Sequence, residues 1–171
     1  ISNDLMPVFV DVEEGKYVVN IDQVERAITK KTKAIMIPLL LGNLPDIKRL
    51  YKIAKKSKLY VILDSCDTLG AKLKKIKAGK YADIITTSFY GSHIITTGGG
   101  GGILATNIPK WRDRAKVLRG WGRGSALISE SEDLKLRYKS RIGNIPYDSK
   151  FIFSEQGYNF LPMEIGSAFG N

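Results

Sequence analysis

Short apolar runs that alternate with amphipathic segments constrain this chain more than any other feature of its sequence. Ala34–Pro38 and Tyr60–Leu63 are continuous apolar runs of strand length. Between them the segment 45–54 repeats its apolar residues at helical spacing, and Pro45 suits a first helical position. Uninterrupted apolar runs are typical of strands buried on both faces. The alternation predicts an α/β protein with a mainly parallel sheet flanked by helices.

The same periodicities predict further elements along most of the chain. We expect helices over 21–28, capped by Asn20, and over 109–118, strands over 84–87 and 102–105, and a short β-rich run over 7–10. Periodicity is lost between 120 and 157, where Gly, Ser, Arg and Asp dominate. A long irregular stretch inside a compact domain is typically functional or disordered. Order is expected to return at Tyr158, with a helix from about Met163.

These patterns predict three parts. Residues 1–119 form a core, 120–157 an irregular segment at an active site or interface, and 158–171 the start of a further helix. The chain starts on Ile1 and ends within that last helix. We therefore expect it to be a fragment of a longer protein.

Charge and composition exclude several classes of function. The net charge is +10, which raises the question of nucleic acid, but the lysines lie in short runs at helix ends and turns. A solvated surface is the first interpretation, an anionic small ligand the second, and no nucleic-acid partner is predicted.

The sequence has no apolar stretch of about 18 residues and no signal-peptide pattern, so no membrane partner and a cytoplasmic location are expected. The single cysteine, Cys66, and the single histidine, His93, exclude an internal disulfide, a multi-cysteine metal site and any two-histidine mechanism. No metal is predicted.

Two polar residues lie where an α/β sheet binds ligands, at the carboxyl ends of strands. Asp64 follows the run 61–63, and Ser88 follows the expected strand 84–87. Either side chain could instead cap a local turn. His93 lies in the next loop and is a candidate general acid or base, because histidine changes charge near neutral pH. Its alternative role is that of a hydrogen-bonded loop residue.

The glycine run 98–102 does not predict a phosphate loop. Nucleotide loops run from a strand through glycines into a helix, whereas these glycines lead into the expected strand 102–105. We expect the run to permit a tight backbone path beside a bulky neighbour.

The sequence at these positions resembles a known family, the DegT-type sugar aminotransferases, which are pyridoxal-phosphate enzymes of fold type I. The resemblance rests on the aspartate segment 62–71, the serine segment 87–93 with its glycine tail 97–102, and segments 21–22, 32–35, 41–46, 119–123 and 157–159. It covers nearly the whole chain in the family's order. It implies part of a large domain with three αβα layers, and it implies that the helix starting in 158–171 leads to a further, C-terminal domain.

One substitution points to a branch of that family. In the aminotransferases, the residue five positions after the serine is the lysine that binds the cofactor covalently, and here it is His93. Histidine at this position marks the NDP-4-keto-6-deoxyhexose 3-dehydratases. A histidine cannot form a Schiff base, but it can move a proton. The resemblance therefore implies noncovalent pyridoxamine phosphate, formed from pyridoxal 5'-phosphate, and dehydration of a nucleotide sugar with His93 as the catalytic residue.

The resemblance also implies roles for five other residues. Asp64 would pair with the cofactor's ring nitrogen, Ser88 would bind its phosphate, and Asp67 falls near its ring hydroxyl, where the aminotransferases carry Gln or His. Asn159 matches an asparagine that reaches the cofactor phosphate of a neighbouring subunit, which implies a homodimer with a shared active site. Arg123 is expected to meet the substrate's nucleotide phosphates.

Some dehydratases of this branch hold an iron–sulfur cluster with four cysteines, the first of them at the position of Cys66. The segment after Arg123 contains no cysteine, so we predict no cluster. Two alternatives to a dehydratase stay open. One is a family member that has lost catalysis and serves as a sensor or binding subunit. The other, a nucleic-acid-binding module, rests on the net charge alone.

Overall fold

The computed structural model describes residues 3–128 and 133–170. Residues 129–132 of the predicted irregular segment, and the last residue of the predicted final helix, therefore lie outside the described residues. The chain divides into two compact units, one reaching Thr106 and the other running over Asn107–Phe169. Each unit is described by itself.

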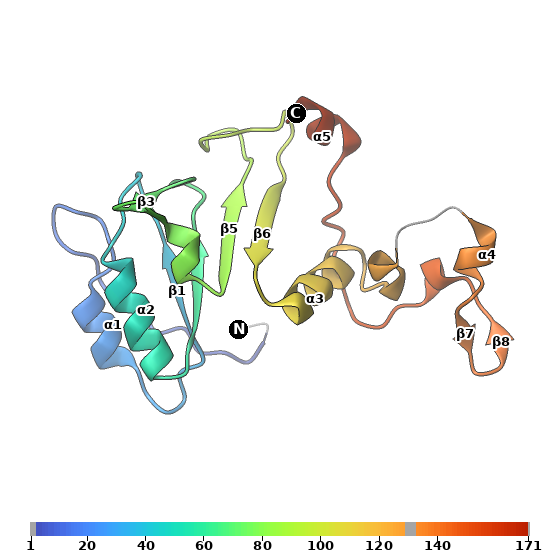
Figure 1. Ribbon diagram of the computed structural model, residues 1–171, viewed down its shortest axis with the longest axis horizontal. Coiled ribbons are helices and arrows are strands. Elements are labelled where there is room, and N and C mark those ends of the chain that lie inside the picture. Colours follow the sequence, from blue (N-terminus) through green and yellow to red (C-terminus); the bar gives the residue numbers. More distant parts are fainter. Residues whose placement is uncertain (1–2, 129–132, 171) are drawn as a thin grey trace. The chain divides into compact units, whose positions relative to one another are not determined.

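A four-stranded sheet forms the centre of the first unit (Figure 1). Its strands are β1 (Ala34–Pro38), β2 (Tyr60–Asp64), β5 (Ile84–Ser88) and β6 (Gly102–Thr106), in the order β1-β2-β5-β6. The pairs β1–β2 and β2–β5 are parallel, and β6 runs antiparallel to β5. This arrangement confirms the predicted α/β class with a mainly parallel sheet.

Two capped helices precede strands of this sheet. Helix α1 (Ile21–Ala27) begins after Asn20, whose side chain accepts a hydrogen bond from the backbone N–H of Gln23, as predicted. Helix α2 (Ile47–Lys56) begins two residues later than expected, because the carboxylate of Asp46 caps it by accepting from the N–H of Arg49. Both helices pack on one face of the sheet and form the core with alternate strand residues; the most buried members are Leu39, Ile47, Leu50, Ala54, Val61 and Leu63.

The expected burial of β1 on both faces was wrong. Ile35 and Ile37 are buried, whereas Met36 between them is 63% exposed, so burial alternates along the strand. Helices α1 and α2 cover only the face that carries Ile35 and Ile37. An apolar run in the sequence does not indicate whether other segments of the chain cover one face of the strand or both faces.

The expected β-rich run over 7–10 was also wrong. Residues 7–10 form no strand in the structure, and Val8 and Phe9 are exposed. Between β2 and β5 the chain forms a short hairpin of β3 (Lys72–Leu73) and β4 (Ile76–Lys77), followed by the 3-10 helix η1 (Ala78–Tyr81).

The second unit contains one longer helix followed by short elements. Helix α3 (Pro109–Arg119) begins at a proline, as predicted. The other elements are η2 (Gly124–Leu127), α4 (Leu134–Arg137), the hairpin of β7 (Arg141–Ile142) and β8 (Ile145–Pro146), η3 (Ser149–Phe151) and α5 (Glu164–Phe169). An ion pair between Arg137 and Asp148 joins α4 to the residue that caps η3. None of the helices in the described ranges has the length and apolarity needed to cross a bilayer.

Candidate functional site

The carboxyl ends of β1, β2 and β5 meet at one edge of the sheet, because these three strands are parallel. Asp64 is the last residue of β2 and lies in register with Pro38 of β1 and Thr86 of β5. Ser88 is the last residue of β5. The sheet therefore brings to this edge the two strand-end residues that the sequence singled out.

Buried hydroxyl groups fix the loop that follows β2. The Ser65 hydroxyl donates to the carbonyl of Thr86 at 2.8 Å. The Thr68 hydroxyl donates to the carbonyl of Leu39 at 2.8 Å and accepts from the N–H of Gly42 at 3.1 Å. Sequence reasoning missed both residues. Their small polar side chains next to Asp64 and Asp67 are the signal that could have found them.

Asp64 and Ser88 both cap local turns, as the alternative interpretation expected. One carboxylate oxygen of Asp64 accepts from the N–H of Cys66 at 3.0 Å, and the Ser88 hydroxyl oxygen accepts from the N–H of Tyr90 at 3.1 Å. A carboxylate has a second oxygen, and a hydroxyl keeps a proton to donate. The turn-capping bonds therefore orient the two side chains and leave each with capacity for a ligand.

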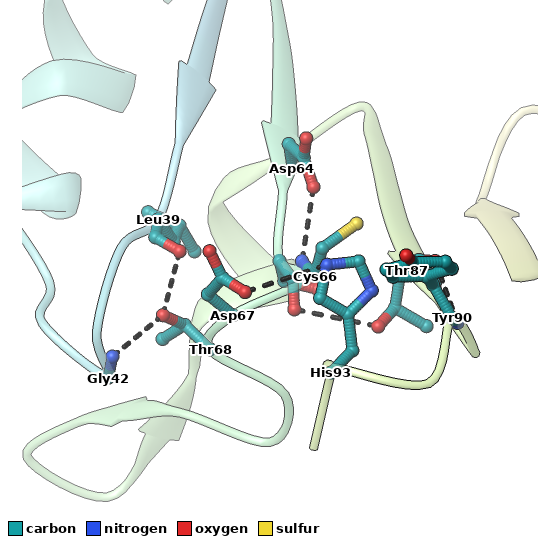
Figure 2. A network of polar contacts seen from close by, with 11 residues as sticks. Leu39, Gly42, Asp64, Cys66, Asp67, Thr68, Thr87, Tyr90 and His93 are labelled. Atoms are coloured by element: carbon teal, nitrogen blue, oxygen red, sulfur yellow. Dashed lines mark hydrogen bonds and ion pairs between the residues drawn. The ribbon is translucent and has the colours of Figure 1, made fainter. Parts of the chain in front are cut away.

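His93 lies opposite Asp67 (Figure 2), with its Nε2 3.6 Å from the Asp67 Oδ1. The imidazole meets the Tyr90 ring edge-on, with 5.8 Å between centroids. Its Nδ1 is buried and has no hydrogen-bond partner among the described residues. A buried nitrogen without a hydrogen-bond partner destabilises the folded protein, and in native structures such atoms commonly bind a ligand or a water molecule.

The Cys66 thiol stands beside two carboxylates of this edge. Burial, and then the neighbouring Asp64 and Asp67, raise the pKa of the Cys66 thiol from 9.0 to about 11. The side chain is therefore a protonated thiol at neutral pH, which suits a packing residue. Across the described ranges there is no cluster of three or more His, Cys, Asp or Glu side chains that could hold a metal ion.

The glycine run makes the close backbone approach that the sequence predicted. Gly102 pairs with Ser88, and a Cβ at Gly102 would lie 2.6 Å from the carbonyl oxygen of Thr87. A Cβ at Gly101 would lie 3.6 Å from the Phe89 ring, and Gly101 has a left-handed φ of +112°. The bulky neighbours are thus β5 itself and Phe89.

Arg123 and Asn159 belong to the second unit. Aromatic rings surround the Arg123 guanidinium, whose Cζ lies 4.5 Å from the centroid of Trp121, 5.5 Å from that of Phe153 and 6.0 Å from that of Phe151. Its Nε is buried and has no hydrogen-bond partner among the described residues, and no carboxylate of these residues lies within ion-pair distance of the guanidinium. Sequence reasoning missed the two phenylalanines, because they lie about thirty residues further along the chain.

Gly122 and Gly157 allow two backbone segments of the second unit to pack closely. A Cβ at Gly122 would lie 1.8 Å from the Glu155 carbonyl oxygen, and one at Gly157 would lie 2.1 Å from the Gly122 nitrogen. Beside this contact, isolated β-bridges join Gly120 to Asn159 and Arg123 to Phe153. Asn159 is exposed, and it is held next to the segment that carries Arg123.

Comparison with known proteins identifies a family and relatives of this chain. The model of the DegT/DnrJ/EryC1/StrS aminotransferase family matches residues 1–146. A dTDP-4-dehydro-2,6-dideoxy-D-glucose 3-dehydratase of Saccharopolyspora spinosa is 35% identical over 98% of this chain, which covers 37% of that protein. The chain thus spans about two fifths of the length of such relatives.

The solved structures that share the fold of the chain include a dehydratase and an aminotransferase. The Escherichia coli GDP-4-keto-6-deoxy-D-mannose-3-dehydratase with bound hydrated PLP has a TM-score of 0.78 and 26% identity, over 95% of this chain and 40% of that one. An aminotransferase from Psychrobacter cryohalolentis has a TM-score of 0.77 and 27% identity, over 96% and 38%. The similar proteins therefore include both a dehydratase and an aminotransferase.

Proposed function

Because the chain belongs to the DegT/DnrJ/EryC1/StrS aminotransferase family, we propose that it is part of an enzyme that dehydrates a nucleotide sugar. The substrate class is an NDP-4-keto-6-deoxyhexose, which loses its 3-hydroxyl group as water. The observation that carries the proposal is the buried Nδ1 of His93, which has no partner among the described residues. The resemblance of segment 87–93 to the aminotransferases, which implies that His93 replaces their lysine, supports it.

The residues at the sheet edge fit pyridoxamine phosphate. Asp64 supplies a carboxylate for the ring nitrogen, Ser88 a hydroxyl for the phosphate, and the loop after β5 a histidine in place of an amine. When bound, the cofactor supplies an electron sink for bond cleavage next to the sugar's 4-keto carbon. A negative charge at Asp64 keeps the ring nitrogen protonated and so sustains that chemistry.

His93 is the residue that moves protons in this proposal. An imidazole both accepts and donates a proton near neutral pH, so one group can take a proton from carbon and then protonate the departing 3-hydroxyl. It cannot hold the cofactor covalently, as a lysine amine does. The substitution therefore favours dehydration over transfer of an amino group.

We assign the recognition of the substrate's phosphates to Arg123 of the second unit. Arg123 carries a charge that no described carboxylate neutralises, and the aromatic rings around it fix the guanidinium. A fixed planar guanidinium suits the bidentate recognition of phosphate. We assign Asn159 to the cofactor phosphate of a partner subunit, in a homodimer with a shared active site.

The test is the product that the whole protein forms. The protein that contains this chain is incubated with pyridoxamine phosphate and a panel of NDP-4-keto-6-deoxyhexoses that differ in nucleotide. The sugar nucleotides are then analysed by mass spectrometry and NMR. A product that has lost the 3-hydroxyl supports the proposal.

Two other results contradict it. An amino group at C4 with the 3-hydroxyl retained identifies an aminotransferase. Tight binding of cofactor and sugar nucleotide without turnover identifies a sensor or binding subunit.

A further inference from the structure

The two ring nitrogens of His93 have different surroundings. Nε2 faces the Asp67 carboxylate at 3.6 Å, whereas Nδ1 is buried with no hydrogen-bond partner among the described residues. In a neutral imidazole one nitrogen carries the proton and the other a lone pair, and the groups facing the ring decide which. The different groups that face Nε2 and Nδ1 therefore bear on which of the two nitrogens carries the proton.

Asp67 is held in place by the loop after β2. Its backbone carbonyl accepts from the N–H of Gly42 at 3.2 Å, and the neighbouring Thr68 hydroxyl bridges Gly42 and the carbonyl of Leu39. These bonds tie Asp67 to the segment that follows β1. The carboxylate therefore starts from a fixed backbone position, 45% exposed and directed at the imidazole (Figure 2).

His93 is fixed from its own side. Its backbone N–H donates to the carbonyl of Tyr90 at 2.9 Å, and the two rings meet edge-on. Asp64, the preceding carboxylate, is engaged by the N–H of Cys66. Among the described residues, Asp67 is thus the carboxylate that lies within ion-pair distance of His93.

We propose that Asp67 is a positioning residue that holds the proton of neutral His93 on Nε2, so that Nδ1 is the nitrogen that accepts and returns protons. This inference rests on the proposed function, because it names the working nitrogen of the proposed general base. A carboxylate at one nitrogen of an imidazole fixes its tautomer in the same way in hydrolase triads and at metal sites. Catalytic hydrogen bonds are often long before the substrate binds and tighten in the complex, so a separation of 3.6 Å is compatible with this pairing.

The test reads the tautomer directly. The whole protein is labelled with ¹⁵N-histidine, and two-bond ¹H–¹⁵N correlations of the neutral imidazole are recorded. The His93 signals are identified by their loss in His93→Gln. We expect a protonated Nε2 and an unprotonated Nδ1.

Substitutions at Asp67 separate a positioning role from a merely structural one. Asp67→Asn keeps the size but lets an amide N–H face Nε2, so the proton should move to Nδ1 and turnover should fall about 10–100-fold. Asp67→Glu keeps a carboxylate and should keep the wild-type tautomer. Asp113→Asn changes an exposed carboxylate that pairs with Arg112 and should leave the His93 signals unchanged.

The outcomes distinguish this proposal from the dehydratase assignment. A tautomer that moves in Asp67→Asn supports the pairing even if the protein dehydrates no sugar nucleotide, in which case only the proposed function falls. A proton on Nδ1 in the wild type, or a tautomer that Asp67→Asn leaves unchanged, overturns the pairing even in an active dehydratase.

Discussion

The Gly122–Gly157 contact gives a prediction whose size follows from the geometry. Gly122 has a left-handed φ of +81°, and a Cβ there would lie 1.8 Å from the Glu155 carbonyl oxygen. Cβ atoms essentially never come within 3.0 Å of a heavy atom outside their own and the adjacent residues. Gly122→Ala must therefore move the backbone at Gly122 and the backbone at Glu155 apart by about 1.2 Å. No side-chain rotation can relieve the overlap, because the obstructing atom belongs to the backbone.

The cost of that separation combines strain and lost hydrogen bonds. A left-handed conformation costs a non-glycine residue about 1–2 kcal/mol. The displaced backbone loses or weakens the bond from Ser154 N–H to the Gly122 carbonyl, at 2.8 Å, and that from Gly122 N–H to the Val117 carbonyl, at 2.9 Å. Each contributes about 1 kcal/mol. We expect Gly122→Ala to lower the free energy of unfolding by about 3–4 kcal/mol.

Urea unfolding followed by tryptophan fluorescence measures this loss, because both tryptophans of the chain, Trp111 and Trp121, lie in the second unit. Gly124→Ala is the matched control. It is two residues further along, and nothing lies within 4 Å of its added Cβ. It should change stability by less than about 0.5 kcal/mol. Equal effects of the two substitutions would refute the close packing of Gly122 and Gly157.

Three further predictions test the first unit. The raised pKa of Cys66, about 11 against the usual 9.0, leaves about 100-fold less thiolate at pH 8, so iodoacetamide should react about 100-fold more slowly than with an ordinary thiol. The reaction should accelerate as pH rises towards 11, and Asp64→Asn should speed it at pH 8 by removing the nearest negative charge. In the whole protein, Asp64→Asn should also slow dehydration by at least about 100-fold while the circular dichroism spectrum is unchanged. Asp83→Ala removes the side chain that accepts from the N–H of Val61 in β2, at 2.8 Å, and that forms an ion pair with Lys55 of α2. Urea unfolding should show that the free energy of unfolding falls by about 2–3 kcal/mol. The control Asp113→Ala should lower it by less than about 0.5 kcal/mol.

Local patterns predicted the elements of the sheet well, because strands and helices here follow short-range rules. Asn20 caps α1 through its own side chain, and Ser88 ends β5 one residue beyond the expected strand. The start of α2 was misplaced, since both Pro45 and Asp46 suit a helix start and the Asp46 carboxylate decides between them. The exposure of Met36 was missed because coverage of a sheet face depends on segments distant in sequence.

The sequence predicted where Asp64 and Ser88 lie in the fold, but not the contacts of the candidate residues. Position after a strand was enough to single out Asp64 and Ser88, and their turn-capping bonds were among the expected alternatives. The pairing of Asp67 with His93 joins loops 26 residues apart, and no local pattern announces it. The rings around Arg123 were missed for the same reason.

Turnover of a His93→Asn variant of the whole protein tests the central claim, that an imidazole does the proton transfers of a dehydration. The variant is given pyridoxamine phosphate and the sugar nucleotide that the wild type dehydrates, and release of 3-deoxy product is measured beside the binding of both ligands. We predict nearly normal binding and a rate at least about 100-fold below that of the wild type. His93→Lys should instead give an adduct with pyridoxal phosphate that borohydride traps, and should favour amino transfer. Dehydration by His93→Asn at the wild-type rate would contradict the account and leave His93 a loop residue.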